Sequence, residues 1–247
     1  MSTSDEQGPA FYATGEQVAW RDLRAVLHPP YTAWHLSYVV LGAMVAPRIN
    51  WTTLVATLFA FFLAVGVCAH SLDELRGRPL GTRIPSRVLW GAASLGLIGA
   101  VALGVAGVDR VGAGLVVFIV VGAILVLAYN LELFAGLVHT DLVFALAWGA
   151  FPVLTSAYAQ SSSLSLSAVV LALAATFVSS AQRSLSTPVR LVRRRATSVE
   201  GALTLDDGRV ERIDRRFLLA PSERALRAMS WAMMTLAMAF VLARRGH

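Results

Sequence analysis

The chain has 247 residues, of which 56% are hydrophobic and only 15% are charged, and its formal net charge is +6 at pH 7. A soluble domain is ordinarily about 45–50% apolar and about 25% charged, so this composition excludes an ordinary soluble protein. Because the apolar residues lie in long runs with the arginines between them, we expect an integral membrane protein with no nucleic-acid partner.

Seven apolar runs follow one another along the chain. A bilayer core of about 30 Å needs roughly 20 apolar residues per helix, and the alternative, a closed barrel, would alternate with a period of two. We therefore predict an all-α polytopic transmembrane bundle of about seven spans. The runs are 31–46, 51–69, 88–107, 111–129, 132–157, 164–182 and 226–243.

These runs divide the chain into four segments. The first residues lack the basic and apolar pattern of a signal peptide, so we expect the first span to remain in the mature fold. Most arginines fall on the side of the N-terminus, which the positive-inside rule places in the cytoplasm. We expect the membrane to be a bacterial or archaeal plasma membrane. The segments are a cytoplasmic N-terminal segment (1–30), a six-span bundle (31–182), a cytoplasmic Arg-rich segment (183–225), and a last transmembrane helix with a short tail (226–247).

The Arg-rich segment is the largest part expected outside the membrane. Residues 205–209 (Leu-Asp-Asp-Gly-Arg) are typical of a turn, and Pro221 with Ser222 as N-cap predicts the start of the last helix. Its arginines suit either anionic lipid headgroups or a phosphate-bearing ligand.

A polar cluster follows the second run directly, where charged groups are costly and therefore suggest function. His70 and Asp73 are three residues apart and share one face of a helix. Asp73 and Glu74 suit Mg²⁺, His70 suits a transition metal or general base catalysis, and Arg76 and Arg78 suit phosphate. The alternative is a capped helix end whose charges pair with one another.

A second polar cluster begins at Tyr129 and Asn130. We predict that Glu132 and His139 share one face of the fifth helix, and that Asp141 lies deeper in the membrane. Such groups normally face a cavity or one another, so a substrate site and a structural hydrogen-bond network both remain open.

His35 lies within the first run. It suits an interhelical hydrogen bond, or a cavity that it shares with His70 and His139. His28 is interpreted as part of an ordinary entry turn. The aromatic residues near the span ends are interpreted as an interfacial belt, among them Tyr31, Trp34, Tyr38 and Trp148. Cys68, the only cysteine, excludes an internal disulfide.

Four short motifs give the chain a resemblance to the UbiA superfamily of intramembrane prenyltransferases, over roughly residues 20–195. Residues 27–31 (Leu-His-Pro-Pro-Tyr) resemble the family's entry to the membrane, and residues 69–73 (Ala-His-Ser-Leu-Asp) occupy the place of its first Asp-rich motif. Arg78-Pro79-Leu80 resembles the Arg-Pro-Leu that follows that motif, and Tyr129-Asn130 resembles its Tyr-Ser. The resemblance implies that Mg²⁺ holds a prenyl diphosphate, whose allylic cation alkylates an acceptor.

The chain also departs from the family pattern. His70 stands where the first motif begins with Asp, and residues 182–190, in the place of the second motif, contain no acid. The family normally has nine spans rather than seven. Half of the family's metal site is therefore missing.

Three interpretations follow. A divergent prenyltransferase or cyclase would place Asp73 and Glu74 on the metal, with Arg78, Arg183 and Arg190 on the phosphates. Acids at 206, 207 and 214 folded back over the cavity would replace the missing motif. The second interpretation is an enzyme of the same fold that uses His70, Asp73, His139 and Asp141 on a neutral lipid or quinone-like substrate. The third is a non-catalytic lipid-binding protein.

Overall fold

The structure is a computed structural model that describes residues 19–133, 136 and 138–245. Almost all of the regular structure is helical, which confirms the predicted all-α class, and two short strands form a hairpin outside the bundle. In chain order the elements are α1 (Ala19–Leu27), α2 (Pro29–Met44), α3 (Trp51–Phe61), the π-helical η2 (Phe62–Ala69), α4 (His70–Leu75), α5 (Ser86–Val111), α6 (Leu115–Asn130), α7 (Asp141–Ala145), the π-helical η4 (Leu146–Ala150), α8 (Phe151–Ser161), α9 (Leu166–Arg195), β1 (Gly201–Thr204), β2 (Val210–Ile213) and α10 (Arg215–Arg245).

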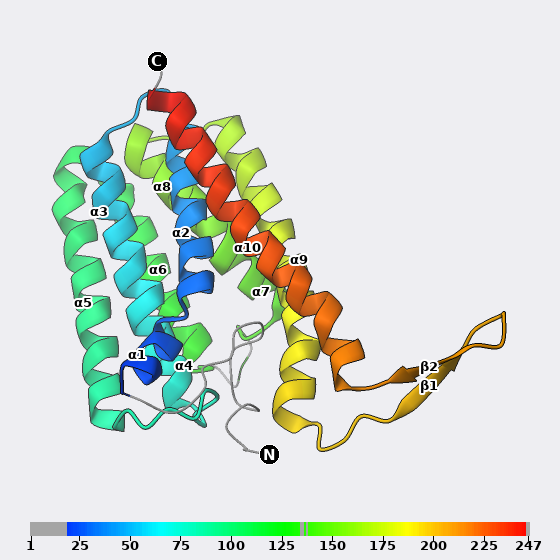
Figure 1. Cartoon of the computed structure of the whole chain (residues 1–247). Helices are drawn as coiled ribbons and strands as arrows, with labels where there is room; N and C mark the ends of the chain where they lie inside the picture. Colours follow the sequence, from blue (N-terminus) through cyan, green and yellow to red (C-terminus); the bar gives the residue numbers. More distant parts are fainter. Residues whose placement is uncertain (1–18, 134–135, 137, 246–247) are drawn as a thin grey trace.

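The helices run side by side in one bundle (Figure 1). Five continuous helical stretches are long and apolar enough to cross a membrane: 51–75, 86–111, 141–161, 166–195 and 215–245. The helices α2 and α6 are also apolar but have only 16 residues each. The length and composition of the helices thus support an integral membrane protein.

Small residues bring α2 against α8 and η4 against α9. A Cβ atom on Gly42 of α2 would lie 2.3 Å from the carbonyl oxygen of Val153 in α8, and one on Gly149 of η4 would lie 2.5 Å from that of Ala175 in α9. Backbones approach this closely only where no side chain intervenes, which is a common way for membrane helices to pack. The surrounding core includes Trp34, Tyr38 and Val153.

The last helix is fixed to the bundle at both of its ends. Arg244 donates hydrogen bonds to the carbonyl oxygens of Met44 and Ala46, beyond the end of α2. At the other end of α10, Glu223 pairs with Arg193 of α9 at 2.5 Å, and Leu226 is buried against α9. The end of α9, which carries several arginines, is therefore held in place.

The prediction of one helix over residues 132–157 is wrong. The helix α6 ends at Asn130, and α7 begins only at Asp141, where the hydroxyl of Thr140 accepts a hydrogen bond from the amide of Val143. The apolar character of the connection hid this break, although Thr140 is a typical N-cap residue. Asp141 is consequently an exposed residue of a first helical turn, with 78% of its side chain accessible, and not a deep intramembrane acid.

The helix boundaries in the Arg-rich segment also differ from the prediction. The helix α9 continues to Arg195, and α10 begins at Arg215 rather than at Pro221, with the carboxylate of Asp214 accepting a hydrogen bond from the amide of Phe217. The predicted turn at 205–209 is confirmed as the tip of the β1–β2 hairpin.

The hairpin extends away from the bundle (Figure 1). Asp207 at its tip pairs with Arg209, and Asp214 caps α10. The acids at 206, 207 and 214 therefore do not fold back over a cavity.

Candidate ligand-binding site

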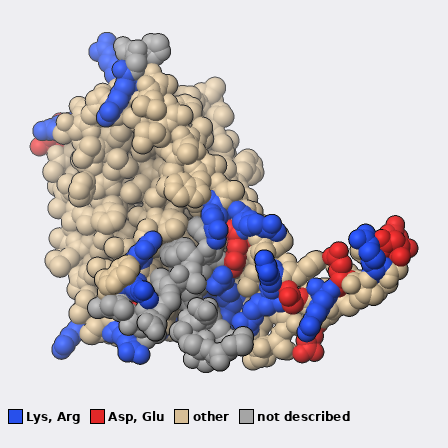
Figure 2. Space-filling model, viewed as in Figure 1, with Lys and Arg blue, Asp and Glu red and all other residues tan. Residues whose placement is uncertain are grey.

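A polar chamber of about 740 Å³ lies at the end of the bundle that carries the hairpin. Its walls come from the start of α2, from α4, from the end of α6 and from the last turns of α9. Five arginines and two carboxylates line it, namely Arg76, Arg183, Arg190, Arg194 and Arg195 with Asp73 and Glu132. Figure 2 shows the basic side chains gathered at the two ends of the molecule, with a broad uncharged band between them.

The π-helical segment η2 delivers His70 and Asp73 to this chamber. The amide of His70 donates to the carbonyl oxygen of Val65, five residues earlier, so α4 starts with an altered rotation. Both side chains line the chamber, which confirms that they share a face. The ring of His70 lies 4.7 Å from that of His28. Burial, with added repulsion from His70 and Arg194, lowers the pKa of His28 well below its usual range, so His28 is neutral at pH 7.

Glu74 does not face the chamber. Its side chain is fully buried and accepts hydrogen bonds from the amides of Leu80 and Thr82 and from the hydroxyl of Thr82. Arg78 donates to the carbonyl oxygen of Ile84 and to the hydroxyl of Ser86. These two predicted ligand-binding residues instead hold the loop after α4.

Arg76 and Glu132 form an ion pair at 2.7 Å on the chamber wall, and both side chains are partly exposed. Arg76 also donates to the carbonyl oxygen of Leu131 at 2.6 Å. The pair joins the end of α4 to the residues that follow α6, so Glu132 already neutralises one of the arginines.

The remaining arginines come from α9. Arg183 pairs with Asp141 at 2.8 Å and lies over the ring of Phe144. Arg190, Arg194 and Arg195 form no ion pair with a carboxylate in the part of the chain that the structure describes. These three residues lie on the last two turns of α9 and line the chamber, where their charge is available to an anion.

The predicted cluster after α6 is only partly assembled in the chamber. The ring of His139 stacks on that of Tyr129 at 4.4 Å, and both line the chamber. Asn130 also lines it, but its amide donates to the carbonyl oxygen of Val126 at 2.7 Å, as a structural residue would. Asp141 is not among the chamber-lining residues, and it is linked to the chamber by its ion pair with Arg183.

The chamber floor contains two kinds of buried polar side chains. On one side, the hydroxyl of Tyr38 accepts hydrogen bonds from Trp34 and from Ser179, so these groups satisfy one another. On the other side, the hydroxyl of Tyr129 and both ring nitrogens of His35 are buried and make no hydrogen bond within 3.5 Å among the described residues, with the backbone of Trp148 near the His35 ring. His35, His70 and His139 thus do share one cavity, as one of the alternatives from the sequence predicted.

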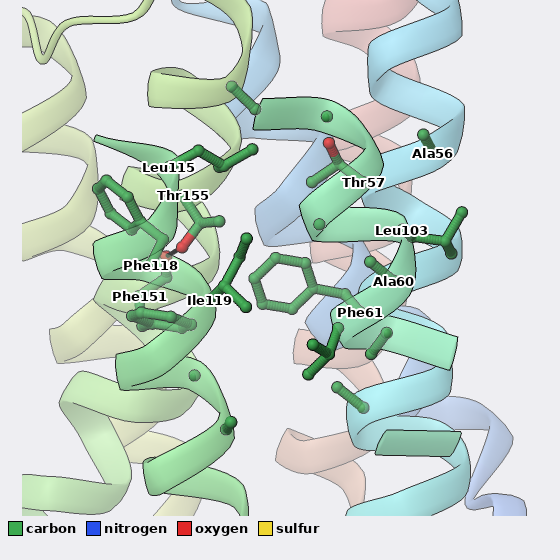
Figure 3. A pocket seen from close by; sticks show the side chains of 18 of the residues that line it. Ala56, Thr57, Ala60, Phe61, Leu103, Leu115, Phe118, Ile119, Phe151 and Thr155 are labelled. Atoms are coloured by element: carbon green, nitrogen blue, oxygen red, sulfur yellow. Dashed lines mark hydrogen bonds between the residues drawn. The ribbon is translucent and has the colours of Figure 1, made fainter. Parts of the chain in front are cut away.

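A second cavity of about 300 Å³ lies deeper in the bundle, between α3, α5, α6 and α8. Its lining is almost entirely apolar, and Figure 3 shows Phe61 and Ile119 pointing toward one another from opposite walls. The hydroxyls of Thr57 and Thr155 donate to carbonyl oxygens of their own helices and add little polarity. His35 and Trp148 line both cavities, so the chamber and the apolar cavity adjoin there.

Several chamber residues were missed or misassigned in the sequence. The sequence pattern indicates an entry turn at His28 and an interfacial belt at Tyr31, Trp34, Tyr38 and Trp148, but all five line the chamber. The one available signal is the position of His28 before two prolines, which restricts its backbone and ends the preceding helix. In the structure His28 has a positive φ of 45°.

The carboxylates do not form a shared metal site. No group of three or more His, Cys, Asp or Glu residues suited to a metal ion occurs in the described ranges. Asp73 is the one chamber carboxylate there that forms no direct ion pair with an arginine, since Glu132 pairs with Arg76. The charges of Arg190 and Arg194 nevertheless act on it. This donor set fits Mg²⁺ only if the ligand supplies further oxygens, as phosphates do.

Comparisons with family models, with curated proteins and with solved structures find no match to this chain. The resemblance to the UbiA superfamily therefore rests on the four short motifs alone.

Proposed function

We propose that this protein binds an isoprenoid diphosphate within the membrane and acts as a divergent prenyltransferase of the UbiA type. The observation that carries the proposal is the contact of two unlike cavities at His35 and Trp148. One is rich in arginine and the other is apolar. A ligand with an anionic head and a hydrocarbon tail matches this division.

The charge of the chamber favours an anionic head. Its five arginines outnumber its two carboxylates, and Arg190, Arg194 and Arg195 form no ion pair with a carboxylate among the described residues. Guanidinium groups bind phosphate oxygens through paired hydrogen bonds and keep their charge in a partly buried site. In this proposal, Arg190 and Arg194 hold the diphosphate together with Arg183.

Mg²⁺ would be bound by Asp73 and by oxygens of the diphosphate. Glu74, which the sequence offered as a second ligand, is already hydrogen-bonded to the loop at Leu80 and Thr82. The arginines then supply the positive charge that a second Asp-rich motif supplies in the UbiA superfamily. When bound, the metal would assist the departure of the diphosphate.

The proposed topology has seven spans. The five long helices are joined by α2 and α6, each of 16 residues, or about 24 Å. This is shorter than a bilayer core of about 30 Å, and the bilayer adjusts to such a mismatch at modest cost. The arginine-rich end, with the chamber, would face the cytoplasm of a bacterial or archaeal plasma membrane, together with the N-terminus.

A non-catalytic lipid-binding role is the second candidate. The observation that favours it is the commitment of Glu74 and Glu132 to structural partners, which leaves Asp73 alone to assist chemistry. The third interpretation, a His-based enzyme acting on a neutral substrate, would use His70 and His139, which line the same chamber.

The first test is thermal stability of the detergent-purified protein with geranylgeranyl diphosphate, with and without Mg²⁺. We expect the melting temperature to rise with the ligand and to rise further with Mg²⁺. Asp73→Asn should remove only the Mg²⁺-dependent part. Arg209→Gln, in the hairpin, is the matched control and should respond like the wild type.

The outcomes separate the candidates. No stabilisation by the diphosphate in any condition would exclude the prenyl diphosphate site. Stabilisation that neither Mg²⁺ nor Asp73→Asn alters would favour the non-catalytic role. If stabilisation depends on both, an assay of radiolabelled prenyl transfer to a membrane extract tests turnover.

A further inference from the structure

We infer that the floor of the chamber binds a second, neutral ligand through a hydroxyl group, held by His35 and Tyr129. The inference rests on the proposed function for the identity of the neighbouring ligand, the isoprenoid diphosphate. It adds a binding subsite that neither the arginines nor the apolar cavity provides.

The first observation is a set of buried polar atoms that lack partners. His35 is 3% exposed and Tyr129 is 6% exposed. The hydroxyl of Tyr129 and both nitrogens of His35 make no hydrogen bond within 3.5 Å in the described residues, and the backbone of Trp148 lies near the His35 ring. Because burying such groups without partners is unfavourable, they need a partner that supplies the missing hydrogen bonds, either a ligand or water.

The second observation is the position of these groups. The rings of His35 and Tyr129 lie 6.2 Å and 5.0 Å from the ring of Trp148, so both contact the same aromatic ring. His35 and Trp148 line both cavities. A molecule bound there would lie where the head of the diphosphate meets its tail.

The chemistry of the two side chains indicates what they bind. A neutral imidazole offers one donor and one acceptor, and a phenol hydroxyl both donates and accepts. A ligand hydroxyl, which also does both, can bridge the hydroxyl of Tyr129 and one ring nitrogen of His35, whereas an anion or a carbonyl group only accepts. The ring of Phe61, 5.6 Å from that of His35, makes the His35 side of the site costly for a charged group.

The opposite side of the floor provides an internal control. Tyr38 is equally buried, but its hydroxyl accepts from Trp34 at 2.9 Å and from Ser179 at 3.2 Å. Since that network is satisfied without a ligand, Tyr38→Phe should leave ligand binding unchanged. Tyr129→Phe removes a hydroxyl of the same kind that is unpaired in the structure.

The experiment compares two probes that differ in one hydrogen-bond donor. Binding of 4-butylphenol and of its methyl ether, 4-butylanisole, is measured by equilibrium dialysis against the full chain in lipid nanodiscs, after subtraction of uptake by protein-free nanodiscs. We expect the phenol to bind the wild type about tenfold more tightly than the ether. Tyr129→Phe should remove that difference, and Tyr38→Phe should keep it. If Tyr129→Phe fails to fold, His35→Leu replaces it.

Equal binding of the two probes, or a phenol preference that survives in both Tyr129→Phe and His35→Leu, would overturn the inference and would leave water as the partner of these groups. Stabilisation by geranylgeranyl diphosphate is measured on the same preparations. Stabilisation by the diphosphate without a phenol preference would reject the second subsite and retain the proposed function. A phenol preference without stabilisation by the diphosphate would reject the diphosphate site alone.

Discussion

The two adjoining cavities are built from different parts of the helices. The polar chamber is formed by helix ends and connections, where α4, α9 and the connections after α4 and α6 supply charged side chains. The apolar cavity is formed by the middle of four helices, where small residues such as Ala56, Ala60 and Gly104 leave space that no side chain fills. Their contact at His35 and Trp148 therefore joins a charged entrance to an apolar interior.

This difference teaches how one bundle can hold an amphipathic ligand. Charged side chains are tolerated near the helix ends, where water or lipid headgroups solvate them. A space that binds a hydrocarbon tail needs only small side chains along its walls. Four sets of substitutions test whether the chamber binds the diphosphate head and the apolar cavity binds the tail.

Removal of two chamber arginines should have the largest effect. We expect the double variant Arg190→Gln and Arg194→Gln to weaken geranylgeranyl diphosphate binding about 100-fold, because each loses a charge-assisted hydrogen bond. Titration by thermal shift provides the affinity, and Arg209→Gln is the control. Binding within about twofold of the wild type would show that the chamber does not hold the head.

Substitutions of the adjacent carboxylates Asp73 and Glu74 should affect different properties. Asp73 should matter for ligand binding and Glu74 for the stability of the fold. Glu74→Gln replaces one carboxylate oxygen with an NH₂ group, which faces the amide of Leu80 or the two donors of Thr82 in a fully buried position, so we expect about 1–3 kcal/mol of lost stability. Asp73→Asn should leave the melting temperature of the unliganded protein nearly unchanged. Thermal unfolding without ligand measures both, and the reverse pattern would contradict the assigned roles.

Filling the apolar cavity should weaken binding of the hydrocarbon tail and leave binding of the diphosphate head unchanged. Ala60→Phe places a ring among the lining residues, and we expect roughly tenfold weaker binding of geranylgeranyl diphosphate. Inorganic diphosphate should bind as it does to the wild type. Val55→Phe, at an exposed position on the same helix, is the control. Equal loss for both ligands would mean that the fold, and not the tail site, was disturbed.

The smallest effect should come from the ion pair on the chamber wall. Glu132→Gln frees Arg76, so diphosphate binding should strengthen about threefold, while stability changes by less than about 1 kcal/mol because the pair is partly exposed. Raising the salt concentration should reduce this gain by screening. Weaker binding in this variant would indicate that Glu132 itself contacts the ligand or its metal.

The sequence predicted the architecture better than the site. Long apolar runs indicate membrane helices because hydrocarbon leaves few alternatives, and the spacing of His70 and Asp73 placed both on one face correctly. The break between Asn130 and Asp141 could not be found in this way, because an apolar connection has the same composition as an apolar helix.

The site depended on tertiary contacts that the sequence does not encode locally. Asp73 and Glu74 are neighbours of the same charge, yet only the fold of the following loop turns Glu74 toward Leu80 and Thr82. Likewise, the position of His28 and Trp148 in the chamber follows from how α2 packs against α8 and η4. The local sequence around them indicates only ordinary boundary residues.

The two π-helical segments have a consequence for how this chain tolerates changes in length. In η2 and η4 the amides of His70 and Phe151 each bond to a carbonyl oxygen five residues earlier. A π turn holds one residue more than an α turn, so deleting a single residue from either segment would restore ordinary α winding and leave the flanking helices in nearly the same rotation. Deleting a residue from the α-helical parts on either side would instead rotate everything beyond it by about 100° and turn His70 and Asp73 away from the chamber. Alignments of more distant chains should therefore tolerate a one-residue gap within η2 or η4 but not in the α-helical turns beside them.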